Sequence, residues 1–214
     1  MPTQRVFSFV GAKGGCGTST LCIEVARQMR RHGSVALIDG GLVGRRSIAV
    51  MLNGVPTFDN LRARSLTPIA SFEDLHVVEL AESLTSSFAL RAATVESITG
   101  RLNDIDAILV DAPEPYAGAL SPLTSRTLRF LIVMEPTRLG AAGARALATD
   151  HLRSVSRTRI VAVMQSRDPR YADLPRSGIE SILEIPIFAE IPSRVDPLYA
   201  SAVARLADDL ASIA

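Results

Sequence analysis

The sequence predicts an α/β fold in which a doubly wound, mostly parallel sheet carries helices on both faces. Short apolar runs alternate along the chain with segments of helical periodicity. The runs show no polar alternation, which is typical of strands covered on both faces. A glycine-rich run follows the first apolar run, and an aspartate ends each of two others, at the strand ends where such sheets bind ligands.

Six strands and two clear helices are predicted. The first helix covers about 19–32 and ends at Gly33, with its apolar stripe formed by Leu21, Val25 and Met29. A second helix near the C-terminus has an acidic polar face, so packing against the sheet is favoured over docking on a membrane. Its apolar stripe consists of Val203, Leu206, Leu210 and Ile213, with Arg205, Asp208 and Asp209 facing away. The predicted strands cover 6–10, 35–38, 75–80, 105–110, 130–134 and 160–164.

Composition and charge restrict the functions open to the chain. With 214 residues, 47% of them hydrophobic, and no linker tract, a single domain over 1–214 is expected. The formal net charge of +1 excludes a global basic field for nucleic acid or an acidic membrane. The apolar run at 6–10 is too short for a signal or membrane-spanning segment, so a cytoplasmic protein without a transmembrane segment is expected.

Lys13 is the only lysine in the chain, against 22 arginines. A compact ammonium on a flexible stem suits a point contact with phosphate, whereas a guanidinium prefers bidentate partners. Lys13 lies in a glycine-rich loop between a predicted strand and a predicted helix, where backbone N–H groups cradle phosphates at the positive helix end. The residues expected to bind nucleotide phosphates there are Gly14, Gly15, Cys16, Gly17, Thr18, Ser19 and Thr20.

Two predicted strands end in an aspartate, Asp39 in one case and Asp111 in the other. Together with the hydroxyl of Ser19, these carboxylates would supply oxygen ligands to a magnesium ion that bridges nucleotide phosphates, partly through water. The alternative is that both aspartates merely cap the loops that follow. The phosphate loop favours the metal site, with Ser19, Asp39 and Asp111 as its ligands.

The run KGGCGTST, from Lys13 to Thr20, resembles the deviant Walker A motif K-G-G-x-G-K-T-T/S of the ParA/MinD family of P-loop proteins. Asp39 matches the Walker A′ aspartate of that family, and Asp111-Ala112-Pro113 matches its Walker B motif. The resemblance implies ATP or ADP and Mg²⁺ as cofactors, and a homodimer that depends on nucleotide. It makes Lys13, which in the family reaches the partner's phosphates, and Asp39 the candidate catalytic residues.

Several positions depart from the family pattern. Thr18 stands where ordinary P-loops have their invariant lysine, and Ala12 replaces the opening glycine. Gly41 occupies the position of a second Walker A′ aspartate, and Gln165 that of an asparagine that reads adenine, a role its amide could still serve. Losing one cation over the transferred phosphate costs on the order of 3 kcal/mol of transition-state stabilisation. Weak or absent ATP hydrolysis is therefore expected, with binding less affected.

The run from Phe7 to Thr20 resembles the CpaE/TadZ proteins of Tad (Flp) pilus assembly, which often lack the P-loop lysine. This resemblance implies a dimerising scaffold that positions a pilus or secretion apparatus at a cell pole, although the receiver-like N-terminal domain usual in that group is missing. The BcsQ-like proteins of cellulose secretion also lack the lysine, but they commonly replace the first lysine by arginine, and Lys13 argues against them.

Two further functional alternatives stay open at this level. One is an active ParA/MinD-type ATPase that partitions DNA or other cargo, and the other is a pseudo-ATPase that forms a constitutive dimer. Non-specific DNA binding is possible but not favoured, because the basic residues lack interleaved aromatics and the net charge is nearly zero. Those residues are Arg153, Arg157, Arg159, Arg167, Arg170 and Arg176.

Overall fold

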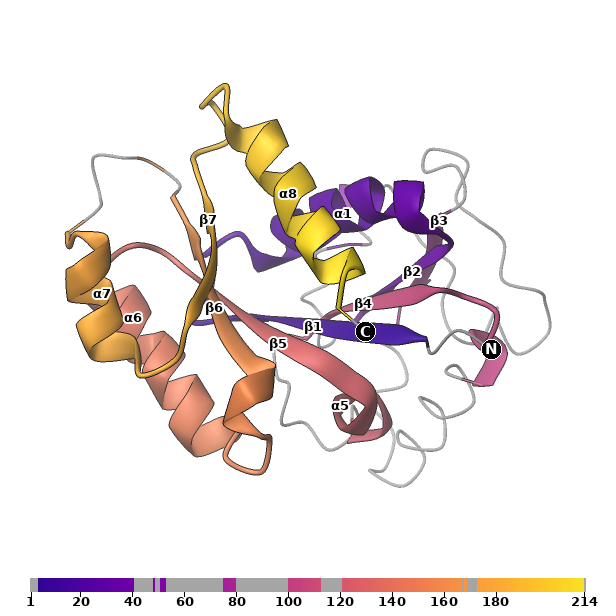
Figure 1. Cartoon of the computed structure of the whole chain (residues 1–214), viewed down its shortest axis with the longest axis horizontal. Helices are drawn as coiled ribbons and strands as arrows, with labels where there is room; N and C mark the ends of the chain where they lie inside the picture. The colour runs from indigo at the N-terminus through magenta and orange to yellow at the C-terminus, as the bar shows by residue number, and fades with distance from the viewer. Residues whose placement is uncertain are drawn as a thin grey trace.

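The computed structural model describes residues 4–40, 48, 51–52, 75–79, 100–112, 121–166, 168 and 173–213. These residues contain a seven-stranded sheet in the order β3-β2-β4-β1-β5-β6-β7, in which every adjacent pair is parallel (Figure 1). Helices pack on both faces, and the predicted doubly wound fold is confirmed. The strands are β1 (Arg5–Gly11), β2 (Val35–Asp39), β3 (Leu75–Glu79), β4 (Ala107–Asp111), β5 (Thr127–Met134), β6 (Ile160–Gln165) and β7 (Ile187–Ile191).

The helices form two layers, one on each face of the sheet. The α1 and α8 helices pack together on one face, and α6 and α7 pack together on the other (Figure 1). The described α-helices are α1 (Thr18–Met29), α5 (Ser121–Arg126), α6 (Arg138–Ala146), α7 (Arg176–Leu183) and α8 (Tyr199–Ala211). Shorter turns are the 3₁₀ segments η1 (Arg30–His32) and η5 (Arg157–Arg159), and the π-helical turn η4 (Leu147–His151).

The strands contribute side chains to two separate hydrophobic cores. Phe7 and Phe9 of β1 lie in the core shared with α1 and α8, whereas Val6 and Val10 lie in the core shared with α6 and α7. This alternation follows from the two-residue period of a strand. Because both faces are covered, both sets of side chains are apolar, which is the pattern that predicted these strands from the sequence.

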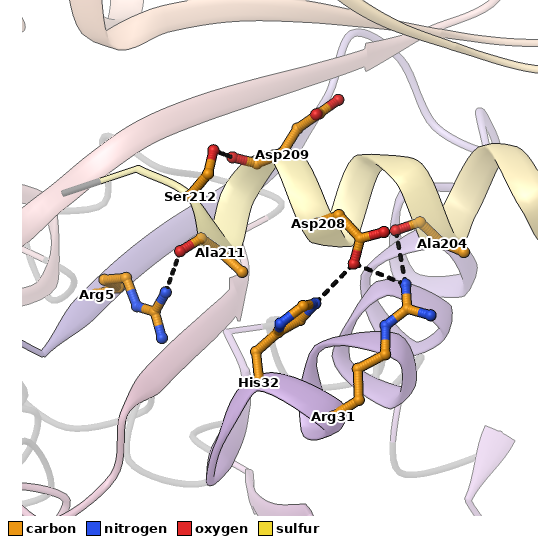
Figure 2. A network of polar contacts seen from close by, with 8 residues as sticks. All are labelled: Arg5, Arg31, His32, Ala204, Asp208, Asp209, Ala211 and Ser212. Atoms are coloured by element: carbon orange, nitrogen blue, oxygen red, sulfur yellow. Dashed lines mark hydrogen bonds and ion pairs between the residues drawn. The ribbon is translucent and has the colours of Figure 1, made fainter.

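The C-terminal helix is attached to the end of the first helix by polar contacts as well as by its apolar stripe. Val203, Leu206 and Leu210 are buried in the core with α1, as predicted. On the outer side, Asp208 accepts hydrogen bonds from Arg31 Nη2 at 2.9 Å and from His32 Nε2 at 2.6 Å (Figure 2). The hydrogen bond from His32 is the main cause that lowers the pKa of Asp208. The turn η1 therefore holds the last part of α8.

Strand β7 was not among the predicted strands. Its sequence, IFAEI, lies at the edge of the sheet, and only Ile191 in it is buried. Prolines at 186 and 192 flank it, and proline is a common strand terminator. A half-exposed edge strand carries a weaker apolar signal than the covered strands, which explains the omission. Within the described residues, no helix is long and apolar enough to cross a membrane.

Helix α6 lies unusually close to the loop that follows β1. A Cβ atom added to Gly143 would lie 2.8 Å from the carbonyl oxygen of Ala12, closer than real Cβ atoms approach a backbone atom. Glycine at 143 therefore lets α6 support the first residue of the glycine-rich loop. Gly178, in α7, has only ordinary contacts at 3.4 to 3.5 Å from such a Cβ atom.

We predict that Gly143→Ala destabilises the protein by about 1–3 kcal/mol, because the added methyl group overpacks against backbone that cannot move aside. Gly178→Ala is the matched control, and it should leave the free energy of unfolding unchanged or raise it by up to about 1 kcal/mol through helix propensity. Urea denaturation of the two variants measures both effects. Equal stability of the two variants would contradict the close approach of α6 to the loop.

Candidate functional site

The loop at residues 12–17 joins β1 to α1 at the carboxyl edge of the sheet. Its backbone first continues the sheet, since the Ala12 N–H donates to the Val133 carbonyl at 2.9 Å. Gly15 and Gly17 then adopt φ angles of 78° and 90°, which favour glycine. Gly17 is the N-cap of α1 and supplies no side-chain cap, so the first N–H groups of the helix stay available to an anion.

Thr18 is bonded inside this loop. Its Oγ1 lies 3.1 Å from Cys16 Sγ, and the Cys16 thiol donates to the Val133 carbonyl at 3.2 Å. Because a thiol has one hydrogen, the Thr18 hydroxyl is the donor to the sulfur. A Cβ atom on Gly11 would lie only 2.8 Å from Thr18 Oγ1, so the hydroxyl also packs against the end of β1. The side chain at 18 thus stabilises the loop and brings no positive charge to it.

The buried Cys16 fills the base of the loop. The remaining predicted phosphate-binding residues surround the opening. Gly14 and Gly15 are exposed, and Ser19 and Thr20 lie half-buried in the first turn of α1. Nothing lies within 4 Å of a Cβ atom placed on Gly14, so the backbone there is open to a ligand.

Two buried carboxylates lie beside the loop. Asp39 and Asp111 end the neighbouring strands β2 and β4 and face each other in the strand register. Both are nearly inaccessible to solvent. Asp39 Oδ2 accepts a hydrogen bond from the backbone N–H of Ile48 at 3.1 Å, and Asp111 has a side-chain hydrogen bond with Ser19. The structure therefore brings together the three predicted metal ligands.

The electrostatics of this pair favour a cation. Burial raises the pKa of Asp111 from 3.8 to about 7, the hydrogen bond with Ser19 opposes the rise, and the charge of Asp39 adds to it. Burial, with the charges of Asp111 and Asp39, also raises the pKa of the Cys22 thiol well above 9, so Cys22 remains a neutral core residue. The pair thus concentrates negative charge at a buried position, where a bound cation would be favoured.

The residues present fit a magnesium ion bound with a nucleotide. Two carboxylates and a hydroxyl are hard oxygen donors, and Mg²⁺ completes such a partial set with phosphate oxygens and water. Within the described part of the chain, no group of three or more His, Cys, Asp or Glu residues could hold a metal by itself. A metal at Ser19, Asp39 and Asp111 would consequently depend on the phosphates for the rest of its ligands.

Gln165 ends β6 and lies against the same loop. A Cβ atom on Gly17 would lie 3.0 Å from Gln165 Oε1 and 3.1 Å from Nε2, so the amide lies flat against the glycine. The side chain is buried, and its Oε1 has no hydrogen-bond partner among the described residues. Because a buried acceptor without a donor costs about 1–3 kcal/mol, this oxygen is suited to a ligand that brings an N–H group.

Lys13 lies on the outer side of the loop and forms an ion pair with Glu135, which directly follows β5. The sequence predicted a phosphate contact for Lys13 and no role for Glu135. The sequence feature that could have indicated Glu135 is its position directly after a predicted covered strand, at the same edge of the sheet as the loop. Gly41 and Pro113, named in the motif comparison, lie outside the described residues.

No protein-family model matches the chain, and no curated protein matches its sequence. Solved structures do resemble it. The cell division ATPase MinD of Pyrococcus furiosus has a TM-score of 0.76 and 19% identity, with 100% of both chains covered. MinD of Pyrococcus horikoshii, solved with Mg-ADP, has a TM-score of 0.74 and 15% identity over 97% of this chain and 96% of that one. A plasmid partition protein of Borrelia burgdorferi has a TM-score of 0.72 and 16% identity over 97% of each chain.

At these identities the likeness establishes the fold. The chain shares its fold, an all-parallel seven-stranded sheet flanked by helices, with these MinD and plasmid partition proteins. The predicted fold class is confirmed.

We predict that Asp111→Asn stabilises the metal-free protein above pH 7. A carboxyl whose pKa is raised from 3.8 in the unfolded chain to about 7 in the fold binds more protons when folded, so stability falls as pH rises from about 4 to 7 and stays low above. Asparagine keeps the hydrogen-bonding capacity toward Ser19 without the charge.

Thermal unfolding in EDTA should therefore give the variant a higher Tm than the parent at pH 8, with the difference vanishing near pH 4. The full shift corresponds to about 4 kcal/mol as an order of magnitude. A variant that is less stable than the parent at pH 8 would show that the aspartate is compensated inside the protein.

Proposed function

We propose that the chain binds ATP with Mg²⁺, forms a homodimer in the bound state and acts as a positioning scaffold that hydrolyses ATP slowly. The observation that carries this proposal is the convergence of three features at one sheet edge. They are the glycine-rich loop at the N-terminus of α1, the buried pair Asp39 and Asp111, and the side-chain hydrogen bond between Ser19 and Asp111. The Mg-ADP held by the similar MinD of Pyrococcus horikoshii agrees with these cofactors.

Each part of a magnesium nucleotide has a partner in this arrangement. The phosphates would meet the backbone N–H groups of 14–19 and the positive end of α1. The metal supplies charge neutralisation at the phosphates and would be held by Ser19, Asp39 and Asp111. The adenine amino group is the type of N–H donor that the buried Gln165 Oε1 lacks. The site would therefore provide partners for the phosphates, the metal and the base of a nucleotide.

Slow hydrolysis follows from the side chain at 18. Thr18 donates its hydroxyl hydrogen to Cys16 and has no charge, so it stabilises neither the bound phosphates nor the charge that develops during transfer. Binding depends on several backbone N–H groups and on the metal, whereas hydrolysis depends strongly on individual charges at the transferred group. The loop can therefore retain binding while catalysis is reduced by several kcal/mol.

Dimerisation is supported by the charged and apolar side chains that are exposed at the same edge of the sheet. Lys13 lies on the outside of the loop, where it could reach a phosphate bound to a second copy. Three of the large apolar side chains exposed in the described part of the chain also follow strand ends at this edge. Leu139 lies in the first turn of α6, the helix that follows β5, and Val195 and Leu198 lie in the segment between β7 and α8, which projects beyond the sheet in Figure 1. Exposed apolar groups of this kind mark interaction surfaces.

The cargo we propose is a pilus or secretion apparatus, on the strength of the CpaE/TadZ-like loop sequence with its missing lysine. The chain would act in the cytoplasm, recruited to a pole or to the inner membrane surface through partners. The contacts of two basic residues weigh against DNA as the alternative cargo. Arg159 packs over the Phe130 ring and donates to the Thr127 carbonyl, and Arg176 pairs with Glu180 and Glu190. Arg167 and Arg170 lie outside the described residues.

We predict that the parent protein turns ATP over slowly and that Thr18→Lys raises the rate at least tenfold. The added ammonium would restore a cation whose contribution is on the order of 3 kcal/mol.

Lys13→Ala should weaken nucleotide-linked dimerisation while leaving the fold intact, and Arg145→Ala, on the outer side of α6, is the control. Steady-state phosphate release and sedimentation with and without Mg-ATP give the two readouts.

Brisk, DNA-stimulated hydrolysis by the parent protein would contradict the scaffold and favour a partition ATPase. A dimer of the same mass with and without Mg-ATP would instead indicate a constitutive dimer. For the cargo, a fluorescent fusion expressed in the native host should gather at one pole together with the pilus machinery, and a fusion spread over the nucleoid would contradict that assignment.

A further inference from the structure

The pairing of β1 with β5 brings Lys13 close to Glu135. Strands β1 and β5 are parallel neighbours, and their register pairs Gly11 with Val133. Lys13 follows Gly11 by two residues, in the loop, and Glu135 follows Val133 by two residues, just past the end of β5, so the two side chains start from neighbouring strand ends. In the folded chain, Lys13 Nζ pairs with Glu135 Oε2.

The two partners differ in how firmly they are held. The Glu135 carbonyl accepts from the Thr137 N–H at 2.7 Å, and a Cβ atom on Gly140 would lie only 2.4 Å from that carbonyl oxygen. Thr137 in turn caps α6 through the Gly140 N–H at 3.0 Å. Glu135 therefore stands on a fixed turn, and its side chain is only 17% exposed. Lys13 has 38% of its side chain exposed, on an open loop.

We propose that Glu135 is a latch that holds Lys13 away from nucleotide phosphates until a nucleotide and a second copy are bound. This inference rests on the proposed function. The chain has no other lysine, so its single ammonium can neutralise either the Glu135 carboxylate or a phosphate. Moving Lys13 to a phosphate breaks its ion pair with Glu135 and brings that carboxylate near an anionic ligand, which opposes the bound dimer.

The latch predicts that removing the charge at 135 favours the bound dimer. Glu135→Gln keeps the size and hydrogen-bonding capacity of the side chain but releases Lys13. Glu184→Gln is the matched control, because it makes the same chemical change in a different ion pair. Glu184 directly follows the last residue of α7 and pairs with Arg145 at 2.8 Å. Glu135→Asp, which keeps the charge but withdraws it by one methylene, should give an intermediate result if the glutamine variant folds poorly.

The single lysine makes the contact itself measurable. An amine-selective reagent can modify only Lys13 and the N-terminal amine, and peptide mass spectrometry separates the two sites. We expect Lys13 in nucleotide-free Glu135→Gln to react severalfold faster than in the parent, with no change in Glu184→Gln. In titrations with Mg²⁺ and a non-hydrolysable ATP analogue, Glu135→Gln should bind the analogue roughly fivefold more tightly than the parent protein does. In sedimentation, Glu135→Gln should form dimers at a lower protein concentration than the parent.

Unchanged labelling of Lys13 in Glu135→Gln would overturn the contact. Faster labelling with unchanged or weaker binding of the analogue would overturn the latch, because Glu135 would then be a positioning residue for Lys13. If neither the parent nor the variant binds the analogue, the proposed function fails, and the latch on nucleotide binding fails with it, even where labelling shows the contact to be present.

Discussion

The juxtaposition of two buried carboxylates, Asp39 and Asp111, is the constraint on which the site depends. Parallel strands with matched registers bring them together at one edge of the sheet, and burial raises the pKa of Asp111 to about 7. Such a pair is costly in a metal-free protein, since like charges removed from water repel each other. The N-terminus of α1 begins beside it and contributes the hydroxyl of Ser19. A magnesium ion bound with a nucleotide would stabilise the negative charge of this buried pair.

Within the loop at residues 12–17 and the first turn of α1, the only cationic side chain is that of Lys13. Thr18 is bonded into the base of the loop, where a hydroxyl steadies the backbone but offers no cation. Lys13, the one lysine of the chain, lies in this loop and pairs with Glu135. In the proposed function, this arrangement lets the loop bind phosphates through its backbone while hydrolysis stays slow, which suits a scaffold whose bound state must last.

Most of the fold could be predicted from local sequence, because the covered strands are continuous apolar runs and α1 has a regular apolar stripe. Asp39 and Asp111 could be found as well, since each directly ends such a run. The edge strand β7 escaped prediction because it is half-exposed and bounded by prolines. The bond between Cys16 and Thr18 and the pair of Lys13 with Glu135 were not predictable, since they depend on side-chain orientation and on which strands are neighbours. Gln165 was recognised by position, but its burial against Gly17 required the structure.

The central claim is that this loop binds a magnesium nucleotide although its usual lysine is absent. Isothermal titration calorimetry of the parent protein with a non-hydrolysable ATP analogue, with Mg²⁺ and then with EDTA, tests it most directly. Saturable binding that is lost on removal of Mg²⁺ is the predicted result, because the metal would join the phosphates to Ser19, Asp39 and Asp111. Absence of binding at millimolar analogue, or binding of equal affinity without Mg²⁺, would contradict the account.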